Sequence, residues 1–178
     1  VGPVLQKDGG DIYYINLSKD DFKLGGSSFS QIRNSIGNEA PTIKDDSYFK
    51  TVFNSIQTLI KNGQIVAGHD IASGGLITTL LELCFADVDL GAEINLSDLG
   101  ESDTIKLLFS ENVGIVFQVH PDGNQDLEKT LSEANIDFKK IGKVVSDPTL
   151  TIKNAGMEMG LNITSLRDTW FKTSNILV

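Results

Sequence analysis

The sequence has 178 residues, of which 40% are hydrophobic and 22% are charged, with a formal net charge of −9. This length fits one domain, or one domain with part of another, and the hydrophobic content is sufficient for a packed core. The acidic balance, without a block of Lys and Arg, argues against nonspecific nucleic-acid binding, and no apolar run is long enough to cross a membrane.

Hydrophobic periodicity divides the chain into alternating strands and helices. Interleaved elements of this kind predict an α+β (mixed α/β) fold, in which a mixed sheet of about five to seven strands carries helices on its faces. The predicted strands are 11–17, 64–68, 91–96, 113–119, 138–145, 150–153 and 157–163, and the predicted helices start near residue 27 and cover 45–62, 76–85, 102–109, 127–134 and 166–171.

The clearest helix is 45–62, whose hydrophobic residues repeat on one face. We expect Val52, Phe53 and Ile56 in the core. Cys84 is the only cysteine, which excludes an internal disulfide, and its apolar neighbours predict a buried thiol. The stretch 113–145 is predicted to be a strand–helix–strand unit.

The first segment that could carry chemistry has the sequence GHDIASGGL, in which a strand leads into a loop and a helix opens on Gly74 and Gly75. Glycine lets the backbone approach a ligand closely, and the N–H groups of a helix N-terminus attract anions. Ser73 could cap the helix or donate to a phosphate, and His69 and Asp70 lie where open sheets place ligands. An ordinary capped helix explains the same pattern, and the P-loop signature is absent.

Two further segments are candidates. Gly25, Gly26 and Ser27 repeat the logic of a glycine pair and a hydroxyl before a helix, although a flexible interdomain turn would look the same. Glu111 precedes a buried strand and either faces a ligand or is solvated. His120 lies in a Pro-Asp-Gly turn and is expected at the surface. The spacing of His and Cys predicts no metal site.

These segments occur in the same order in the AIR-synthase superfamily. The chain resembles the C-terminal half-domain of that superfamily, and within it the second such repeat of the large, single-chain phosphoribosylformylglycinamidine synthases. The resemblance covers nearly the whole chain. It is carried by Leu24-Gly25-Gly26-Ser27, His69-Asp70 with Gly74-Gly75-Leu76, Leu108-Phe109-Ser110-Glu111 with Gly114, and the segment from Leu166 to Ser174.

The resemblance implies an enzyme that uses ATP and glutamine to convert formylglycinamide ribonucleotide into its amidine in purine biosynthesis. In that family ATP activates the formamide oxygen, and ammonia from a glutaminase domain displaces phosphate. ATP or ADP with Mg²⁺ is expected in the full enzyme. His69 is the catalytic candidate, Glu111 is a further candidate, and phosphate or nucleotide binding is implied for Gly25, Gly26, Ser27, His69, Asp70, Ser73, Gly74 and Gly75.

The resemblance also predicts how the chain is organised. Residues 1–37 are expected to be the tail of a preceding N-terminal-type domain, 38–165 the C-terminal-type domain, and 166–178 the start of a linker towards a glutaminase domain. The expected partners are the other domains of one cytoplasmic polypeptide and small nucleotides, with no nucleic acid and no membrane. We expect the isolated fragment to be inactive and to bind nothing beyond phosphate or sulfate.

Two departures from the family pattern leave alternatives open. Ala72 precedes Ser73 where related chains often have a serine, and the arginine that small-type relatives carry is missing near Gly114. Both changes fit a noncatalytic nucleotide-binding, phosphate-binding or scaffold domain. The equivalent domain of another superfamily member, such as selenophosphate synthetase, thiamine-monophosphate kinase or the hydrogenase maturation factor, is the remaining alternative.

Overall fold

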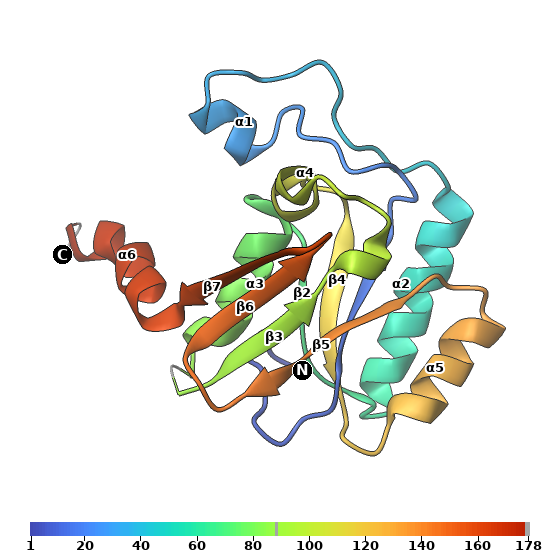
Figure 1. The fold of residues 1–178 in the computed structure, drawn as a ribbon. Coiled ribbons are helices and arrows are strands. Elements are labelled where there is room, and N and C mark those ends of the chain that lie inside the picture. Colours follow the sequence, from blue (N-terminus) through green and yellow to red (C-terminus); the bar gives the residue numbers. More distant parts are fainter. Residues whose placement is uncertain (88, 177–178) are drawn as a thin grey trace.

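The computed structural model describes residues 1–87 and 89–176. Its centre is a seven-stranded sheet in the order β2-β4-β1-β5-β3-β6-β7 (Figure 1). Only β3 and β6 pair in parallel among these neighbours, so the sheet is mixed, as predicted. The strands are β1 Ile12–Asn16, β2 Ile65–Asp70, β3 Gly91–Asn95, β4 Gly114–Val119, β5 Lys139–Val145, β6 Thr149–Asn154 and β7 Met157–Asn162.

Helices cover both faces of the sheet, which confirms the α+β class (Figure 1). Because successive side chains of a strand point to opposite faces, β1 contributes side chains to two separate hydrophobic cores. Tyr13 and Ile15 pack with α2 and α5, whereas Ile12 and Tyr14 pack with α3 and α4. The helices are α1 Ser28–Ile32, α2 Asp46–Lys61, α3 Gly75–Phe85, α4 Thr104–Phe109, α5 Asn124–Glu133 and α6 Ile163–Ile176, with a 3-10 turn, η1, at Ser97–Leu99.

The strand–helix–strand unit predicted over 113–145 is present as β4, α5 and β5, but its two strands are not neighbours. β1 lies between them and pairs antiparallel with both. The segment before residue 38 therefore contributes a central strand to the same sheet as the segment after it. The boundaries expected at residues 37 and 165 stay predictions about a longer polypeptide.

The amphipathic helix α2 begins where the sequence predicts, because the side chain of Asp45 accepts a hydrogen bond from the Tyr48 N–H at 2.9 Å and caps it. Val52 and Ile56 are buried, as expected. The prediction for Phe53 is wrong, since this side chain is 51% exposed. One residue beyond Val52 is a turn of about 100° around the helix, so Phe53 lies at the flank of the buried face, stacked on the ring of Phe49.

Several elements run further than their periodicity indicates. β2 extends through His69 and Asp70, α5 begins already at Asn124, and α6 begins at Ile163 and continues beyond residue 171. In the described ranges, no helix combines the length and the apolar character that crossing a bilayer requires.

Candidate functional site

The two glycine loops and the segment around Glu111 lie at the same edge of the sheet, where β1 and β2 end and β4 begins. Asn16 at the end of β1 pairs with Gly114 at the start of β4, and Asp70 at the end of β2 pairs with Ile115. The loops that follow β1 and β2 therefore leave the sheet at the same edge as the loop that enters β4. The helices α1 and α4 lie at this edge, at the top of Figure 1.

Glu111 joins the two glycine loops at this edge. Its Oε1 accepts a hydrogen bond from the backbone N–H of Ser28 at 2.9 Å and another from the N–H of Gly74 at 2.8 Å. Both alternatives considered for Glu111, ligand-facing and solvated, therefore miss its main contacts, which lie inside the protein. Partial burial raises the pKa of this carboxyl, but the hydrogen bonds from Ser28 and Gly74 outweigh that effect and hold the pKa below its ordinary value.

The start of α3 depends on the two glycines for its backbone shape. Gly74 and Gly75 have φ angles of 90° and 76°, in the left-handed region that favours glycine. A Cβ atom at Gly75 would lie 2.7 Å from the carbonyl oxygen of Leu108, so this position also needs glycine for close approach. The Gly75 N–H donates to the carbonyl of Ala72 at 3.1 Å.

Ser73 does not cap α3, contrary to the capping role considered for it. Gly74 is the N-cap residue and offers no side-chain acceptor, while Ser73 is exposed. The capping acceptor is instead the carboxylate of Glu111, which comes from the segment between α4 and β4. The sequence gives no local signal for this contact, because the cap and the helix are far apart along the chain.

The backbone N–H groups of the first glycine pair, Gly25 and Gly26, also form hydrogen bonds within the protein. The N–H of Gly25 donates to the carbonyl of Glu39 at 2.9 Å, and that of Gly26 donates to the carbonyl of Ile36 at 2.8 Å. A Cβ atom at Gly25 would collide with the same Glu39 carbonyl. The pair thus allows the chain to fold back over itself after α1.

Ser27 is the N-cap of α1. Its hydroxyl is buried, accepts from the Ser30 N–H at 3.3 Å and donates to the Leu24 carbonyl at 2.7 Å. A hydroxyl in this position stabilises the first turn of the helix. Glu111 binds both Ser28 and Gly74, so the candidates Gly25, Gly26 and Ser27 lie near Gly74. The backbone N–H groups of these three residues already donate to carbonyl groups of the protein.

His69 lies near the end of the edge strand β2 between two carboxylates. Its Nε2 is 3.3 Å from Oε2 of Glu82, and its Nδ1 is 3.4 Å from Oδ1 of Asp70. It lines a hollow of about 480 Å³ whose other walls include Ile56 and Phe117. The carboxylate of Asp70 is mostly exposed.

Asn112, next to Glu111, was not singled out from the sequence, yet it anchors the loop after β1. Its Nδ2 donates to the hydroxyl of Ser18 at 3.1 Å and to the carbonyl of Asp21 at 3.0 Å. Asp20 in the same loop is buried and accepts from Nζ of Lys23 at 2.9 Å. The adjacent pair Glu111 and Asn112 therefore fixes both candidate loops. The polar run Ser110-Glu111-Asn112 shortly before β4 could have marked this segment as a candidate, although it does not reveal which loops it contacts.

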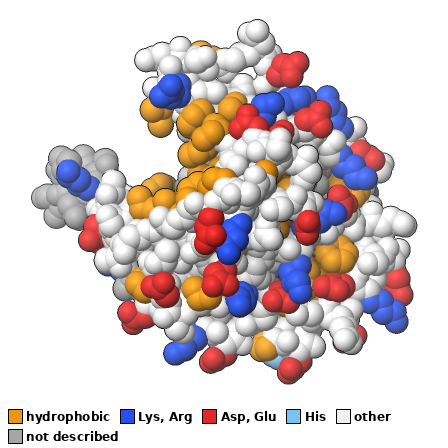
Figure 2. Space-filling view, in the orientation of Figure 1, with side chains coloured by type: hydrophobic (Ala, Val, Ile, Leu, Met, Phe, Trp, Pro, Cys, Tyr) orange, Lys and Arg blue, Asp and Glu red, His pale blue; other side chains and the backbone are white. Residues whose placement is uncertain are grey.

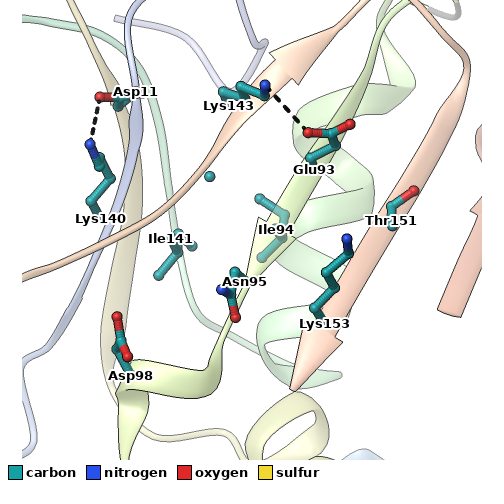
Figure 3. A pocket seen from close by; sticks show the side chains of 11 residues that line it. Asp11, Glu93, Ile94, Asn95, Asp98, Lys140, Ile141, Lys143, Thr151 and Lys153 are labelled. Atoms are coloured by element: carbon teal, nitrogen blue, oxygen red, sulfur yellow. Dashed lines mark ion pairs between the residues drawn. The ribbon is translucent and has the colours of Figure 1, made fainter. Parts of the chain in front are cut away.

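A second hollow, of about 460 Å³, lies on the face of the sheet formed by β5, β3 and β6 (Figure 3). Three lysines point from this face, and each has a carboxylate partner. The pairs are Lys140 with Asp11 at 3.4 Å, Lys143 with Glu93 at 3.5 Å and Lys153 with Glu158 at 3.5 Å. The charges balance, so this surface does not concentrate the positive potential that an anion site requires.

The remaining expectations concern single residues. Cys84 is buried, as predicted, and burial raises the pKa of its thiol to about 12. His120 is exposed, also as predicted. Within the part of the chain that the structure describes, no three His, Cys, Asp or Glu side chains are grouped so that they could hold a metal ion.

Comparisons with known proteins give one consistent result. Residues 9–153 match the sequence profile of the family described as AIR synthase related protein, C-terminal domain. The chain is 35% identical over 171 residues, 96% of its length, to a probable phosphoribosylformylglycinamidine synthase, chloroplastic/mitochondrial, of Arabidopsis thaliana. It is 35% identical over 186 aligned residues, 94% of its length, to a phosphoribosylformylglycinamidine synthase of Dictyostelium discoideum. It spans only 12% and 14% of these two relatives.

A solved structure shows the same fold at lower sequence similarity. PurL of T. maritima, complexed with ATP, superposes on 94% of this chain with a TM-score of 0.69 and 16% identity. This chain covers 27% of that protein. At 16% identity the superposition shows a shared fold and nothing about function.

Proposed function

The chain belongs to the AIR synthase related protein family, as a C-terminal domain, and from this premise we propose that it is a working part of a phosphoribosylformylglycinamidine synthase. The observation that carries the proposal is the 35% identity to synthases over nearly the whole chain. Such an enzyme would be an ATP- and glutamine-dependent ligase of purine biosynthesis. The other superfamily members considered from the sequence are not favoured, because the two relatives that are 35% identical to the chain carry the synthase name.

The proposed role of this domain is to form one wall of a nucleotide or phosphate site at the edge where the glycine loops meet. The candidate wall comprises Gly25, Gly26, Ser27, His69, Asp70, Ser73, Gly74 and Gly75. Helix N-termini attract anions, and at α3 that attraction is already met by the carboxylate of Glu111. We therefore propose that Glu111 shapes this wall, and that a phosphate group is held chiefly by other parts of the polypeptide.

The ligands of the full enzyme are proposed by analogy. The T. maritima PurL structures hold ATP, ADP or AMPPCP, which supports an adenine nucleotide as the ligand class. Mg²⁺ would accompany the nucleotide in the full enzyme. No step of the chemistry is assigned to His69, whose imidazole would be a positioning or proton-transfer group only if a ligand reached it.

Other domains of the same polypeptide are the proposed partners. Large hydrophobic side chains are exposed around the upper edge of the molecule, among them Ile32, Ile36 and Ile105, and on α6, where Trp170 and Phe171 are half exposed. Figure 2 shows hydrophobic side chains along the hollow between the projecting segment that contains α1, at the top of the view, and the rest of the molecule. Exposed apolar surface of this kind is typical of interfaces. Residues 166–178 would lead on towards a glutaminase domain.

The cytoplasmic location expected from the sequence stays a prediction. The name of the Arabidopsis relative gives a chloroplastic or mitochondrial location for that protein.

Amidine formation by the gene product tests the proposal. A purine-requiring strain that lacks its own synthase would receive either the gene that contains this segment or the same gene with the segment deleted. We expect growth, and ATP- and glutamine-dependent amidine formation, only with the intact gene, and no turnover by the purified 178-residue chain. Failure of the intact gene would contradict the proposed enzyme, and turnover by the isolated chain would contradict its role as one part of a larger site.

A further inference from the structure

The two edge strands of the sheet, β2 and β7, differ in how they are protected. The N-terminal segment lies along β2, where Gly2 pairs in parallel with Ala67 and the Gly68 N–H donates to the Gly2 carbonyl at 3.1 Å. The register of β2 against β4 also shifts between Ile65 and Ala67. Covering segments and register irregularities of this kind keep an edge strand from pairing with another chain.

The edge strand β7 has none of these protections within the described residues. It pairs with β6 alone, and the register is continuous along the whole strand. The strand contains no proline, and its one charged side chain, Glu158, is paired with Lys153 at 3.5 Å. Helix α6 continues beyond the end of β7 (Figure 1) and packs on α3, where the ring centres of Trp170 and Phe85 are 6.0 Å apart. The outer side of β7 is therefore open.

The hydrogen-bond ladder determines which main-chain groups of β7 point outward. The Ile163 N–H donates to the carbonyl of Pro148, directly before β6, at 3.0 Å. Residues of an antiparallel strand alternate between those that exchange hydrogen bonds with the neighbouring strand and those that do not. Leu161 therefore bonds to β6, whereas the N–H and C=O groups of Gly160 and Glu158 point away from it. No hydrogen bond from another described residue reaches these outward groups.

Apolar surface accompanies the open side of β7. Met159 and Leu161 pack against the core on the α3 side but stay half-buried. Hydrophobic side chains line the hollow between the segment that contains α1 and the rest of the molecule (Figure 2), on the side of the sheet where β7 lies (Figure 1). An added strand would cover this apolar margin with its own side chains and would bond to the free groups of Gly160 and Glu158.

We propose that β7 is a docking strand that pairs with a β-strand from another domain of the same polypeptide. The chain spans only 12% and 14% of its two relatives, so most of a synthase polypeptide lies outside it and can supply that strand. The inference rests on the proposed function only in taking this chain as part of a longer synthase. Main-chain hydrogen bonds hold the added strand, and its apolar side chains lie on the face of Met159 and Leu161.

Amide hydrogen exchange in the isolated chain and in the full-length gene product tests the docking strand. Exchange of residues 157–162 would be followed by mass spectrometry in both proteins. We expect the amides of Glu158 and Gly160 to exchange at least about tenfold more slowly in the full-length protein, because each gains a hydrogen bond there. Equal exchange in the two proteins would overturn the proposal.

Two substitutions of Gly160 separate strand pairing from burial under another domain. Gly160→Pro removes the outward N–H and leaves the pairing with β6 in place, since proline is tolerated at an edge position whose N–H faces outward. Gly160→Ala keeps the N–H and is the matched control, because its Cβ would lie 3.4 Å from Cγ2 of Thr149, in ordinary contact. We expect Gly160→Pro, but not Gly160→Ala, to abolish the slow exchange of the Glu158 amide in the full-length protein.

A Glu158 amide that is equally slow in both full-length variants would also overturn the proposal, because burial and not strand pairing would then protect it. If Gly160→Pro did not fold, the exchange of the two wild-type proteins would decide the question. Neither readout uses amidine formation, so a failure of the docking strand and a failure of the proposed enzyme are distinguishable.

Sedimentation of the isolated chain tests the other possible occupant of this edge, β7 of a second copy. We expect a monomer at micromolar concentration, both for wild type and for the two Gly160 variants. A wild-type dimer that Gly160→Pro dissociates and Gly160→Ala does not would assign the edge to a second copy and overturn the proposal.

Discussion

Replacing Glu111 by alanine should destabilise the protein and release both glycine loops at once. The change removes an acceptor for the Ser28 and Gly74 N–H groups, at 2.9 and 2.8 Å. A charge-assisted hydrogen bond contributes about 1.5–3 kcal/mol, and the lower value applies to a partly exposed carboxylate, so the two bonds together contribute about 3 kcal/mol. For a protein of this size that loss lowers Tm by roughly 6–12 °C.

Glutamine at this position separates charge from hydrogen bonding. Glu111→Gln keeps an acceptor oxygen but loses the negative charge, so we expect about half of the loss, roughly 1.5 kcal/mol. Because the folded-state pKa of Glu111 is held below the ordinary glutamate value of 4.5, the charge stabilises the fold at pH above 4.5. The difference between wild type and Glu111→Gln should therefore shrink as pH falls through the folded-state pKa.

Denaturant unfolding and amide hydrogen exchange measure these effects. Exchange of the Ser28 and Gly74 amides should speed up in Glu111→Ala more than that of the Leu80 amide, which lies inside α3. Glu133→Ala is the matched control, since Glu133 is exposed on α5 with one ion pair at 4.0 Å, and its stability should stay within about 0.5 kcal/mol of wild type. If Glu111→Ala matched this control in stability and exchange, the bridging role would be refuted.

Three further predictions concern the fold. Gly75→Ala should cost at least about 2 kcal/mol in denaturant unfolding, because its Cβ would lie 2.7 Å from the Leu108 carbonyl at a φ of 76°; wild-type stability would contradict this. Cys84 should react with a thiol reagent only as fast as the protein unfolds, since its thiol is buried with a pKa near 12; rapid labelling of native protein would contradict its burial. Val52→Ala should cost about 2–3 kcal/mol and Phe53→Ala less than about 1 kcal/mol, and equal costs would show that α2 is rotated from its described orientation.

The sequence by itself determined most of the helices and strands and the position of the two glycine loops. Helix α2 could be predicted from its period and from Asp45 as its cap, because both signals lie within one helix. Gly74 and Gly75 marked the start of α3 for the same reason. The order of the motifs carried the resemblance to the family, which no single motif specifies and which the family match confirms.

The tertiary structure alone decided what these elements contact. β1 is inserted between β4 and β5, so strands that are consecutive along the chain are separated in the sheet. The acceptor that caps α3 comes from Glu111, and the hydroxyl of Tyr14 is buried without a hydrogen-bond partner among the described residues. Local periodicity reports which side of an element is apolar, but pairing across a sheet depends on the register of distant segments. The contacts of Glu111 and the unpaired state of the Tyr14 hydroxyl could therefore not be read from the sequence.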